Sequence, residues 1–131
     1  MELPYIIDFP RIGSDQQGFL VPFENLPIQI EHVYCIGPVP ENEQRGNHAK
    51  KKNSQVLVAI GGKAELKLEA PDGQFFEFFL ESNDKGLFIP AGYWRSAKLW
   101  KGCYLLGLHS IKYTESDYVR NYDDFKKLNN R

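Results

Sequence analysis

The sequence has few of the residues that hold metals, form disulfides or cross membranes. Only two cysteines and three histidines occur in 131 residues. Cys35 and Cys103 fit no Cys-x-x-Cys motif and lie in apolar, strand-like segments, so we expect two buried free thiols. No apolar run approaches the ~20 residues of a membrane-spanning helix, and the N-terminus lacks a basic region followed by an apolar stretch. We therefore expect a cytoplasmic protein without a membrane segment.

An excess of charge of either sign is also missing. Lys and Arg number 16 against 17 Asp and Glu, which gives a net charge of −1. This balance argues against a protein that coats nucleic acid. The composition is 42% hydrophobic and 14% aromatic, as is typical of a globular protein. The length fits one domain, and we predict that residues 1–131 form it.

Motifs for phosphate loops, dinucleotides and metals are absent as well. Gly62-Lys63 is followed by alanine, and no Gly-x-Gly-x-x-Gly occurs. A metal in a small β-barrel usually needs two imidazoles and a carboxylate, but two positions beyond His48 stands Lys50, whose ammonium would repel a divalent cation. We interpret His32 and His109 as strand histidines without a role in a site. We expect no metal and no organic cofactor.

Short β-rich segments, separated by Gly, Pro, Asn and Asp, extend from the N-terminus to about residue 110. This spacing is typical of an all-β sandwich or barrel rather than of alternating strands and helices. The predicted strands span residues 5–9, 18–23, 28–36, 55–60, 63–70, 74–81, 86–90, 96–100 and 103–110.

Two of these strands predict different surroundings. Residues 55–60 are apolar almost throughout, which indicates a strand covered on both faces. Residues 63–70 alternate between apolar and charged, which indicates one dry face and one wet face. Gly61-Gly62 between them predicts a type I′ hairpin, and Pro71-Asp72-Gly73 predicts a second hairpin.

The C-terminal segment changes from a strand pattern to a helix pattern. Thr114-x-x-Asp117 resembles a capping box, and acidic residues come early and lysines late. We predict a helix over about 114–129 that packs on the barrel. Its packing face would consist of three aromatic residues at helical spacing, Tyr118, Tyr122 and Phe125.

The stretch "EQRGNHAKKKNSQ", residues 43–55, gathers basic residues before the most strand-like segment. We interpret residues 51–53 as solvated. In an extended chain, however, His48 and Lys50 point to the same face. The planar guanidinium of Arg45 suits phosphate oxygens, and an imidazole has an unperturbed pKa near ~6.5, which suits proton transfer at neutral pH. The pattern indicates an anionic ligand and proton transfer.

Three stretches, taken in order, resemble the sugar 3,4-ketoisomerase family of metal-free cupins: "RGNHAKKKNSQVLVAIGGKAELKLEAPDG", "KGLFIPAGYW" and "ESDYVRNYDDFKK". The likeness spans nearly the whole chain. It implies a cupin or jelly-roll β-barrel over about 1–110 with a C-terminal α-helix, in a homodimer. It also implies that dTDP-4-keto-6-deoxyglucose is the substrate and that its ketone moves from C4 to C3 through an enediolate, without a cofactor. The products would feed deoxyamino sugars of bacterial surface glycans, such as lipopolysaccharide, or of glycosylated natural products.

The resemblance also implies roles for individual residues. His48 matches the base, Arg45 matches the arginine that grips the diphosphate, and Tyr34 matches a pocket tyrosine that offers its hydroxyl to the sugar. Lys50 stands where the family has a second histidine, and it would stabilise the enediolate or act as an acid. The remaining expected substrate-binding residues are Gln17, Gln55, Trp94 and Arg95.

The sequence leaves several alternatives open. Family members carry His or Arg after the tryptophan, so Arg95 with Gln17 leaves the C4 configuration of the product undecided, with a lean to gluco. A sugar 3,5-epimerase on the same kind of barrel is one rival, and it would also exchange a proton at C5. A catalytically silent nucleotide-sugar binding module is the other, favoured by the missing second histidine.

Overall fold

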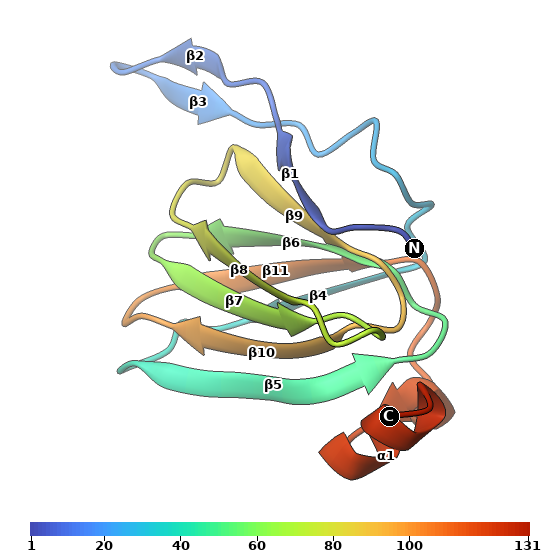
Figure 1. Ribbon diagram of the computed structural model, residues 1–131. Helices are drawn as coiled ribbons and strands as arrows, with labels where there is room; N and C mark the ends of the chain where they lie inside the picture. The colour runs from blue at the N-terminus through green and yellow to red at the C-terminus, as the bar shows by residue number, and fades with distance from the viewer.

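The computed structural model describes residues 1–131 as two five-stranded antiparallel sheets that face each other (Figure 1). The first sheet contains, in spatial order, β1 (Tyr5–Asp8), β9 (Lys85–Ile89), β6 (Gln55–Ile60), β11 (Tyr104–His109) and β4 (His32–Ile36). The second contains β12 (Tyr118–Val119), β5 (Glu43–Lys50), β10 (Trp94–Leu99), β7 (Ala64–Glu69) and β8 (Phe75–Leu80). The all-β fold of the jelly-roll type is confirmed, as an open sandwich whose sheets do not close into one barrel.

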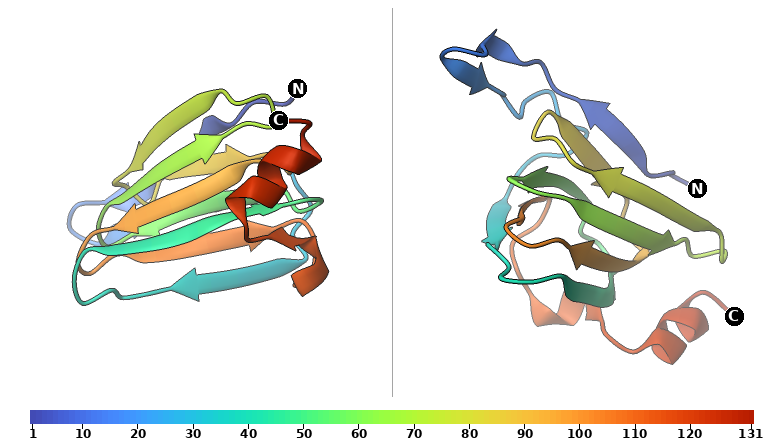
Figure 2. Two further views of the ribbon diagram at one scale, coloured as in Figure 1. Left: turned by 60° about the horizontal axis from the view of Figure 1, so that its bottom comes forward. Right: turned by 90° about the vertical axis from the view of Figure 1, so that its left-hand side faces the viewer.

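Three smaller elements complete the chain. A hairpin of β2 (Ile12–Ser14) and β3 (Gly18–Leu20) stands away from the sandwich, and α1 (Tyr122–Leu128) lies at the other end of the molecule (Figures 1 and 2). A 3₁₀ turn, η1 (Glu115–Asp117), precedes β12. None of the helices is long and apolar enough to cross a membrane.

The interior has two parts that share β6. Leu57 and Ala59 point between the sheets into the larger cluster, whereas Val56 and Val58 point outward and are covered by Phe9 and its neighbours. All four β6 side chains are fully buried, which confirms the prediction of a strand covered on both faces. The dry face of β7 is confirmed too, since its inward side chains Ala64, Leu66 and Leu68 are 0 to 1% exposed.

The Gly61-Gly62 hairpin prediction is wrong, because β6 and β7 lie in different sheets and do not pair. Only Gly61 has a positive φ, of 74°. A Cβ on Gly62 would lie 2.9 Å from the Cα of Cys103, so this glycine permits a close approach of two backbones where the chain crosses between sheets. The predicted hairpin at residues 71–73 is confirmed by the pairing of β7 with β8.

The predicted C-terminal helix over 114–129 is too long. The helix begins at Tyr122, after Asn121 accepts a hydrogen bond from the Asp124 N–H at 3.0 Å, whereas Thr114 makes no side-chain capping bond. Tyr118 therefore belongs to strand β12 and not to a helical aromatic stripe. The capping-box interpretation was wrong because Asp117, its third-position acid, has other partners: it accepts hydrogen bonds from the N–H groups of residues 52 and 53.

Strands β2 and β5 were not predicted. In β5, Gly46 and Asn47 have positive φ angles of 97° and 60°, which interrupt a regular strand pattern. The thiol prediction is half right: both cysteines are free and Cys103 is buried, but Cys35 is exposed. Cys35 points outward on β4, where alternate residues face solvent.

Candidate active site

A cavity of about 250 Å³ opens between the two sheets at the end nearest α1. Its lining includes one lysine, two arginines and two histidines but no carboxylate, so it favours an anionic ligand. Its lining residues are His32, Tyr34, Ile36, His48, Lys50, Arg95, Tyr118 and Arg120. No group of three or more His, Cys, Asp and Glu side chains is arranged to hold a metal ion.

The backbone of β5 directs His48 and Lys50 into this cavity. His48 lies opposite Arg95 on β10, and the register shifts between Arg95 and Ser96, beside the positive-φ pair at Gly46 and Asn47. Opposed residues of an antiparallel pair project from the same face, so His48 and Arg95 both point inward. Lys50 follows two residues later on that face, which confirms the prediction that it shares a face with His48.

Several buried polar atoms around the cavity have no hydrogen-bond partner in the protein. They include Nε2 of His48, the hydroxyl of Tyr34, Nδ1 of His32, Oε1 of Gln55, and Nε and Nη1 of Arg95. A buried polar atom without a partner costs free energy, about 1–3 kcal/mol each. Their concentration around one cavity makes this cavity the candidate site for a polar ligand.

Burial and neighbouring positive charges set the protonation of the two inward β5 side chains. Burial, followed by the charges of Arg95 and Lys50, lowers the pKa of His48 to about 3. Burial and Arg95 lower the pKa of Lys50 to about 7, although Asp117 opposes the shift. At neutral pH His48 is therefore an uncharged base, and Lys50 exchanges readily between amine and ammonium.

Aromatic rings fix the walls of the cavity. The ring of Tyr34 lies across Gly107, where a Cβ would come within 2.2 Å of the ring, so only glycine leaves room for it. Tyr118 lies beside His48, with 5.1 Å between ring centroids. Arg120 covers the ring of Tyr118 at 4.3 Å.

Sequence reasoning missed four residues of this region: His32, His109, Tyr118 and Arg120. The alternation of His32, Tyr34 and Ile36 along β4 is a signal that could have identified the first, because Tyr34 was already expected at the site. Tyr118 and Arg120 were hidden by the helical pattern of the segment in which they lie.

The other expected site residues have different surroundings. Arg45 pairs with Ala97, whose side chain is inward, so it lies on the inner side of β5, but it is exposed and outside the cavity lining. Gln55 is buried on the inner face of β6. Trp94 points to the outer face and lines a separate hollow of about 280 Å³ with Tyr122. The roles expected for these residues stay predictions.

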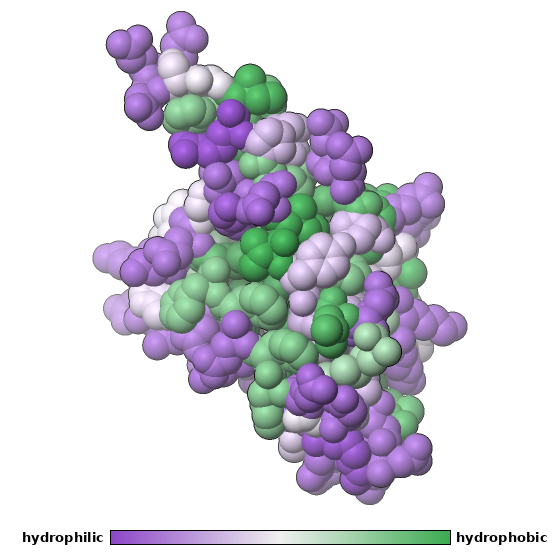
Figure 3. All heavy atoms as spheres, turned by 45° about the horizontal axis from the view of Figure 1, so that its top comes forward, coloured by the Kyte–Doolittle hydropathy of each residue, from purple (hydrophilic) through white to green (hydrophobic).

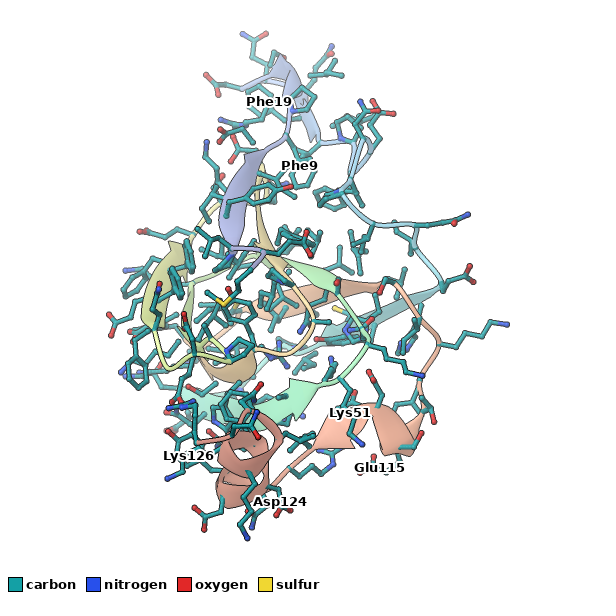
Figure 4. The ribbon with its side chains drawn as sticks, turned by 45° about the vertical axis from the view of Figure 1, so that its right-hand side comes forward. Phe9, Phe19, Lys51, Glu115, Asp124 and Lys126 are labelled. Atoms are coloured by element: carbon teal, nitrogen blue, oxygen red, sulfur yellow. The ribbon has the colours of Figure 1, made fainter.

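Gln17 lies in the turn of the β2–β3 hairpin. In Figure 4, Phe19 of this hairpin lies at the end of the molecule opposite Lys51, which directly follows the cavity residue Lys50 in the chain. Within one chain, Gln17 is therefore separated from the cavity by the length of the sandwich, and its expected contact with a sugar stays a prediction.

Comparison with known proteins agrees with this geometry. The family model described as FdtA (WxcM-like, C-terminal) matches residues 3–130. A TDP-4-oxo-6-deoxy-alpha-D-glucose-3,4-oxoisomerase from Aneurinibacillus thermoaerophilus is 38% identical, over 93% of this chain and 89% of that protein.

Solved structures give the same result. QdtA, a sugar 3,4-ketoisomerase from Thermoanaerobacterium thermosaccharolyticum in complex with TDP, superposes with a TM-score of 0.86 at 34% identity, over 97% of this chain and 94% of that one. A 3,4-ketoisomerase from Helicobacter canadensis gives a TM-score of 0.87 at 32% identity, over 98% of each chain. A dTDP-4-dehydrorhamnose 3,5-epimerase from Bacillus anthracis, at 14% identity and a TM-score of 0.77 over 88% of this chain and 76% of that one, shares the fold. This chain belongs to the FdtA-like family of sugar 3,4-ketoisomerases.

Proposed function

We propose that this protein is an isomerase that converts dTDP-4-keto-6-deoxyglucose into a dTDP-3-keto-6-deoxyhexose. The observation that carries the proposal is His48: the residue is 8% exposed, its Nε2 has no partner, and its lowered pKa keeps it neutral in a cavity lined by cations. An uncharged imidazole aimed into an anion-attracting cavity is suited to remove a proton from a bound ketosugar.

The names of the relatives support this substrate. QdtA has been crystallised with TDP, and a mutant in which one histidine is replaced by asparagine has been crystallised with TDP-4-keto-6-deoxyglucose. A WlaRB TDP-quinovose 3,4-ketoisomerase from Campylobacter jejuni matches with a TM-score of 0.86 at 33% identity.

The chemistry follows from the position of the ketone. The proton on C3 is acidic because it is α to the C4 carbonyl, and His48 removes it to give an enediolate. The negative charge on that intermediate develops among Arg95, Lys50 and the hydroxyl of Tyr34. Reprotonation at C4 leaves the ketone on C3. Arg45, at the exposed part of the same strand face, is proposed to hold the diphosphate.

A homodimer is part of the proposal. The hairpin exposes Ile12 and Leu20, at 59% and 62%, and apolar side chains gather on the face shown in Figure 3. If a partner subunit covers this surface, Gln17 of one protomer can reach a site on the other. Light scattering should report a dimer for the wild type and a monomer for a variant carrying Ile12→Lys and Leu20→Lys; a wild-type monomer would remove Gln17 from the site.

The remaining parts of the proposal are broader. We place residues 1–131 in one domain, because both sheets contribute to a common interior. A cytoplasmic location and a role in deoxyamino sugar synthesis rest on the family resemblance. Trp94 and Gln55 are proposed as substrate-binding residues on the same basis, with Arg95 and Gln17 deciding the C4 configuration.

One NMR time course in D₂O tests the activity. The wild-type protein should convert dTDP-4-keto-6-deoxyglucose into a 3-keto product with deuterium taken up from solvent, and His48→Asn should bind the sugar without converting it. Deuterium at C5 would instead indicate a 3,5-epimerase. Binding without any conversion, unchanged in His48→Asn, would indicate a silent binding module.

A further inference from the structure

Lys50 lies between the cavity and His109, a buried histidine to which no role has yet been assigned. Its Nζ is 3.3 Å from Nε2 of His109, and both residues are buried, at 4% and 3% exposure. Lys50 lines the cavity beside His48, whereas His109 does not and lies behind the lysine. His109 contacts the cavity residues Lys50, Tyr34 and His32, and of these contacts only the one with Lys50 is a hydrogen bond.

The direction of this hydrogen bond follows from the charges. Burial, and then the positive charge of Lys50, lowers the pKa of His109 to about 3, so the ring is neutral at pH 7. A lysine ammonium has only donors, so Nε2 of the neutral ring accepts and Nδ1 carries the proton. His109 is held in place by its pairing with His32 on β4 and Gln55 on β6, and by an edge-to-face contact with Tyr34 at 4.8 Å.

No carboxylate forms a salt bridge with Lys50. The titratable and charged groups around it are His48 on the same strand, His32 and Tyr34 on β4, Arg95 on β10, His109 on β11, and Lys112, Tyr113, Asp117, Tyr118 and Arg120 in the C-terminal segment. Asp117, the acid among them, already accepts from the N–H groups of residues 52 and 53. Arg95 repels the ammonium, so both protonation states of Lys50 are accessible at neutral pH.

We propose that Lys50 carries a proton from one substrate oxygen to the other during the isomerisation, and that His109 is the positioning residue that holds its ammonium for this transfer. The inference rests on the proposed function and deepens it. Moving a ketone from C4 to C3 requires O4 to gain a proton and O3 to lose one, in addition to the carbon steps. A side chain that donates and then accepts a proton beside the base meets that need.

The steps balance as follows. His48 takes the C3 hydrogen as a proton, and the electron pair of that bond forms the C3=C4 double bond while the carbonyl electrons move to O4. The Lys50 ammonium donates a proton to O4 and becomes an amine, and the amine then accepts the proton of the O3 hydroxyl. As the C3=O bond forms, C4 takes the proton from His48. Both side chains return to their starting states, and no oxidant or reductant is needed.

Two substitutions of Lys50 distinguish proton transfer at the sugar carbons from proton transfer between the sugar oxygens. Lys50→Arg keeps a positive charge, but a guanidinium does not release its proton; Lys50→Met removes both charge and proton. In Lys50→Arg we expect deuterium exchange at C3 within tenfold of wild type, with formation of the 3-keto product at least a hundredfold slower. Equal losses of exchange and product in Lys50→Arg would overturn the proposal, as would product formation at the wild-type rate.

Two substitutions of His109 test the positioning role through the pH profile of kcat. Activity should fall above about pH 7 as Lys50 loses its proton. His109→Leu removes the acceptor that stabilises the ammonium, so the alkaline midpoint should move about one pH unit lower. His109→Gln offers an amide oxygen as a replacement acceptor and should restore the midpoint to within about 0.3 units. The same midpoint in all three proteins would assign His109 a packing role only.

A direct titration keeps the inference testable if a variant does not fold. In wild-type protein with ¹³C-labelled lysine, the Lys50 signal, assigned by its absence from Lys50→Arg, should titrate near pH 7. Titration above pH 9 would leave an ammonium that cannot act as a carrier, and would overturn the proposal. Since this measurement needs no turnover, an inactive wild type would contradict the proposed function and leave the Lys50 titration as a separate result.

Discussion

The two ends of the space between the sheets are built from the same strands but have opposite character. On β10, Arg95 faces the cavity, while Ala97 and Leu99, further along the same face, belong to the apolar cluster. On β6, Gln55 is succeeded on the inner face by Leu57 and Ala59. Each strand thus changes from polar to apolar within one or two side chains on its inner face.

Because of this difference, we expect the apolar end to determine the stability of the fold and the polar end to determine activity. Apolar side chains that are 0 to 1% exposed fill the far end, and their burial stabilises the fold. The near end contains buried polar atoms that have no partner within the protein, which opposes folding, and a polar ligand in the cavity would supply partners for them. Substitutions at the two ends should therefore have opposite consequences.

The largest effect should come from the polar end, in His48→Asn. Removal of the base should lower kcat by about a thousandfold, within the 10²–10⁴ range of general base catalysis. Affinity for TDP, measured by calorimetry, should stay within about threefold, and the free energy of unfolding should not fall, because the substitution removes no apolar contact between the sheets. A kcat within tenfold of wild type would show that another group removes the proton.

The apolar end should give the reverse result in Leu66→Ala. Leu66 is fully buried in the cluster between the sheets, and its truncation should lower the free energy of unfolding by about 3 kcal/mol, within the usual 2–5. Turnover at 25 °C should change less than twofold. Leu128→Ala, at an exposed position on α1, is the control and should cost less than about 0.5 kcal/mol in a urea titration. A large loss of turnover in Leu66→Ala would mean that the two ends are coupled.

The apolar end is also the part of the fold that the sequence predicts best. The bounds of β6 agree with the predicted 55–60, and those of β7 differ from 63–70 by one residue at each end, because alternation and apolar runs are local properties. The failures come from long-range pairing. Nothing within Gly61-Gly62 distinguishes a hairpin from a crossing between two sheets.

The residues of the polar end are harder to predict from the sequence, and the reason is physical. The inward residues of β5 and β12 face a ligand cavity, so they carry His, Lys and Tyr where a core strand would carry apolar side chains. Tyr118 matched a helical spacing with Tyr122, and His109 had no partner that local sequence could identify, since Lys50 is 59 positions away. The residue pattern indicated His48 and Lys50, resemblance to a family supplied Tyr34 and Arg95, and the fold was needed to add the others.

The third prediction concerns acid, and it follows from the two neutral imidazoles at the polar end. Burial lowers the pKa of His48 and of His109 from 6.5 to about 3, so between these values the unfolded chain binds more protons than the folded protein. Stability is therefore unaffected by these two groups above pH 6.5 and falls as the pH drops toward 3, by at most about 1.4 kcal/mol per pH unit for each ring.

Urea titrations at pH 6.5, 5.5 and 4.5 would measure this slope, with His109→Gln as the comparison. That variant lacks one of the two rings, so its stability should fall less steeply than that of the wild type, by up to about 1.4 kcal/mol per pH unit. If wild type and variant lose stability in parallel, His109 does not remain neutral in the folded protein, and its hydrogen bond with Lys50 runs in the other direction.

The smallest effect should come from Arg95→Met, and its sign is informative. Arg95 is 4% exposed, with Nε and Nη1 unpaired, so an apolar side chain of similar length should raise the free energy of unfolding by about 1 kcal/mol while lowering turnover. Lys67→Met is the control, because Lys67 is an exposed cation on the outer side of β7 and its loss should change stability by less than about 0.5 kcal/mol. A loss of stability in Arg95→Met would show that the guanidinium is already satisfied without ligand, and the polar end would then stabilise the fold as the apolar end does.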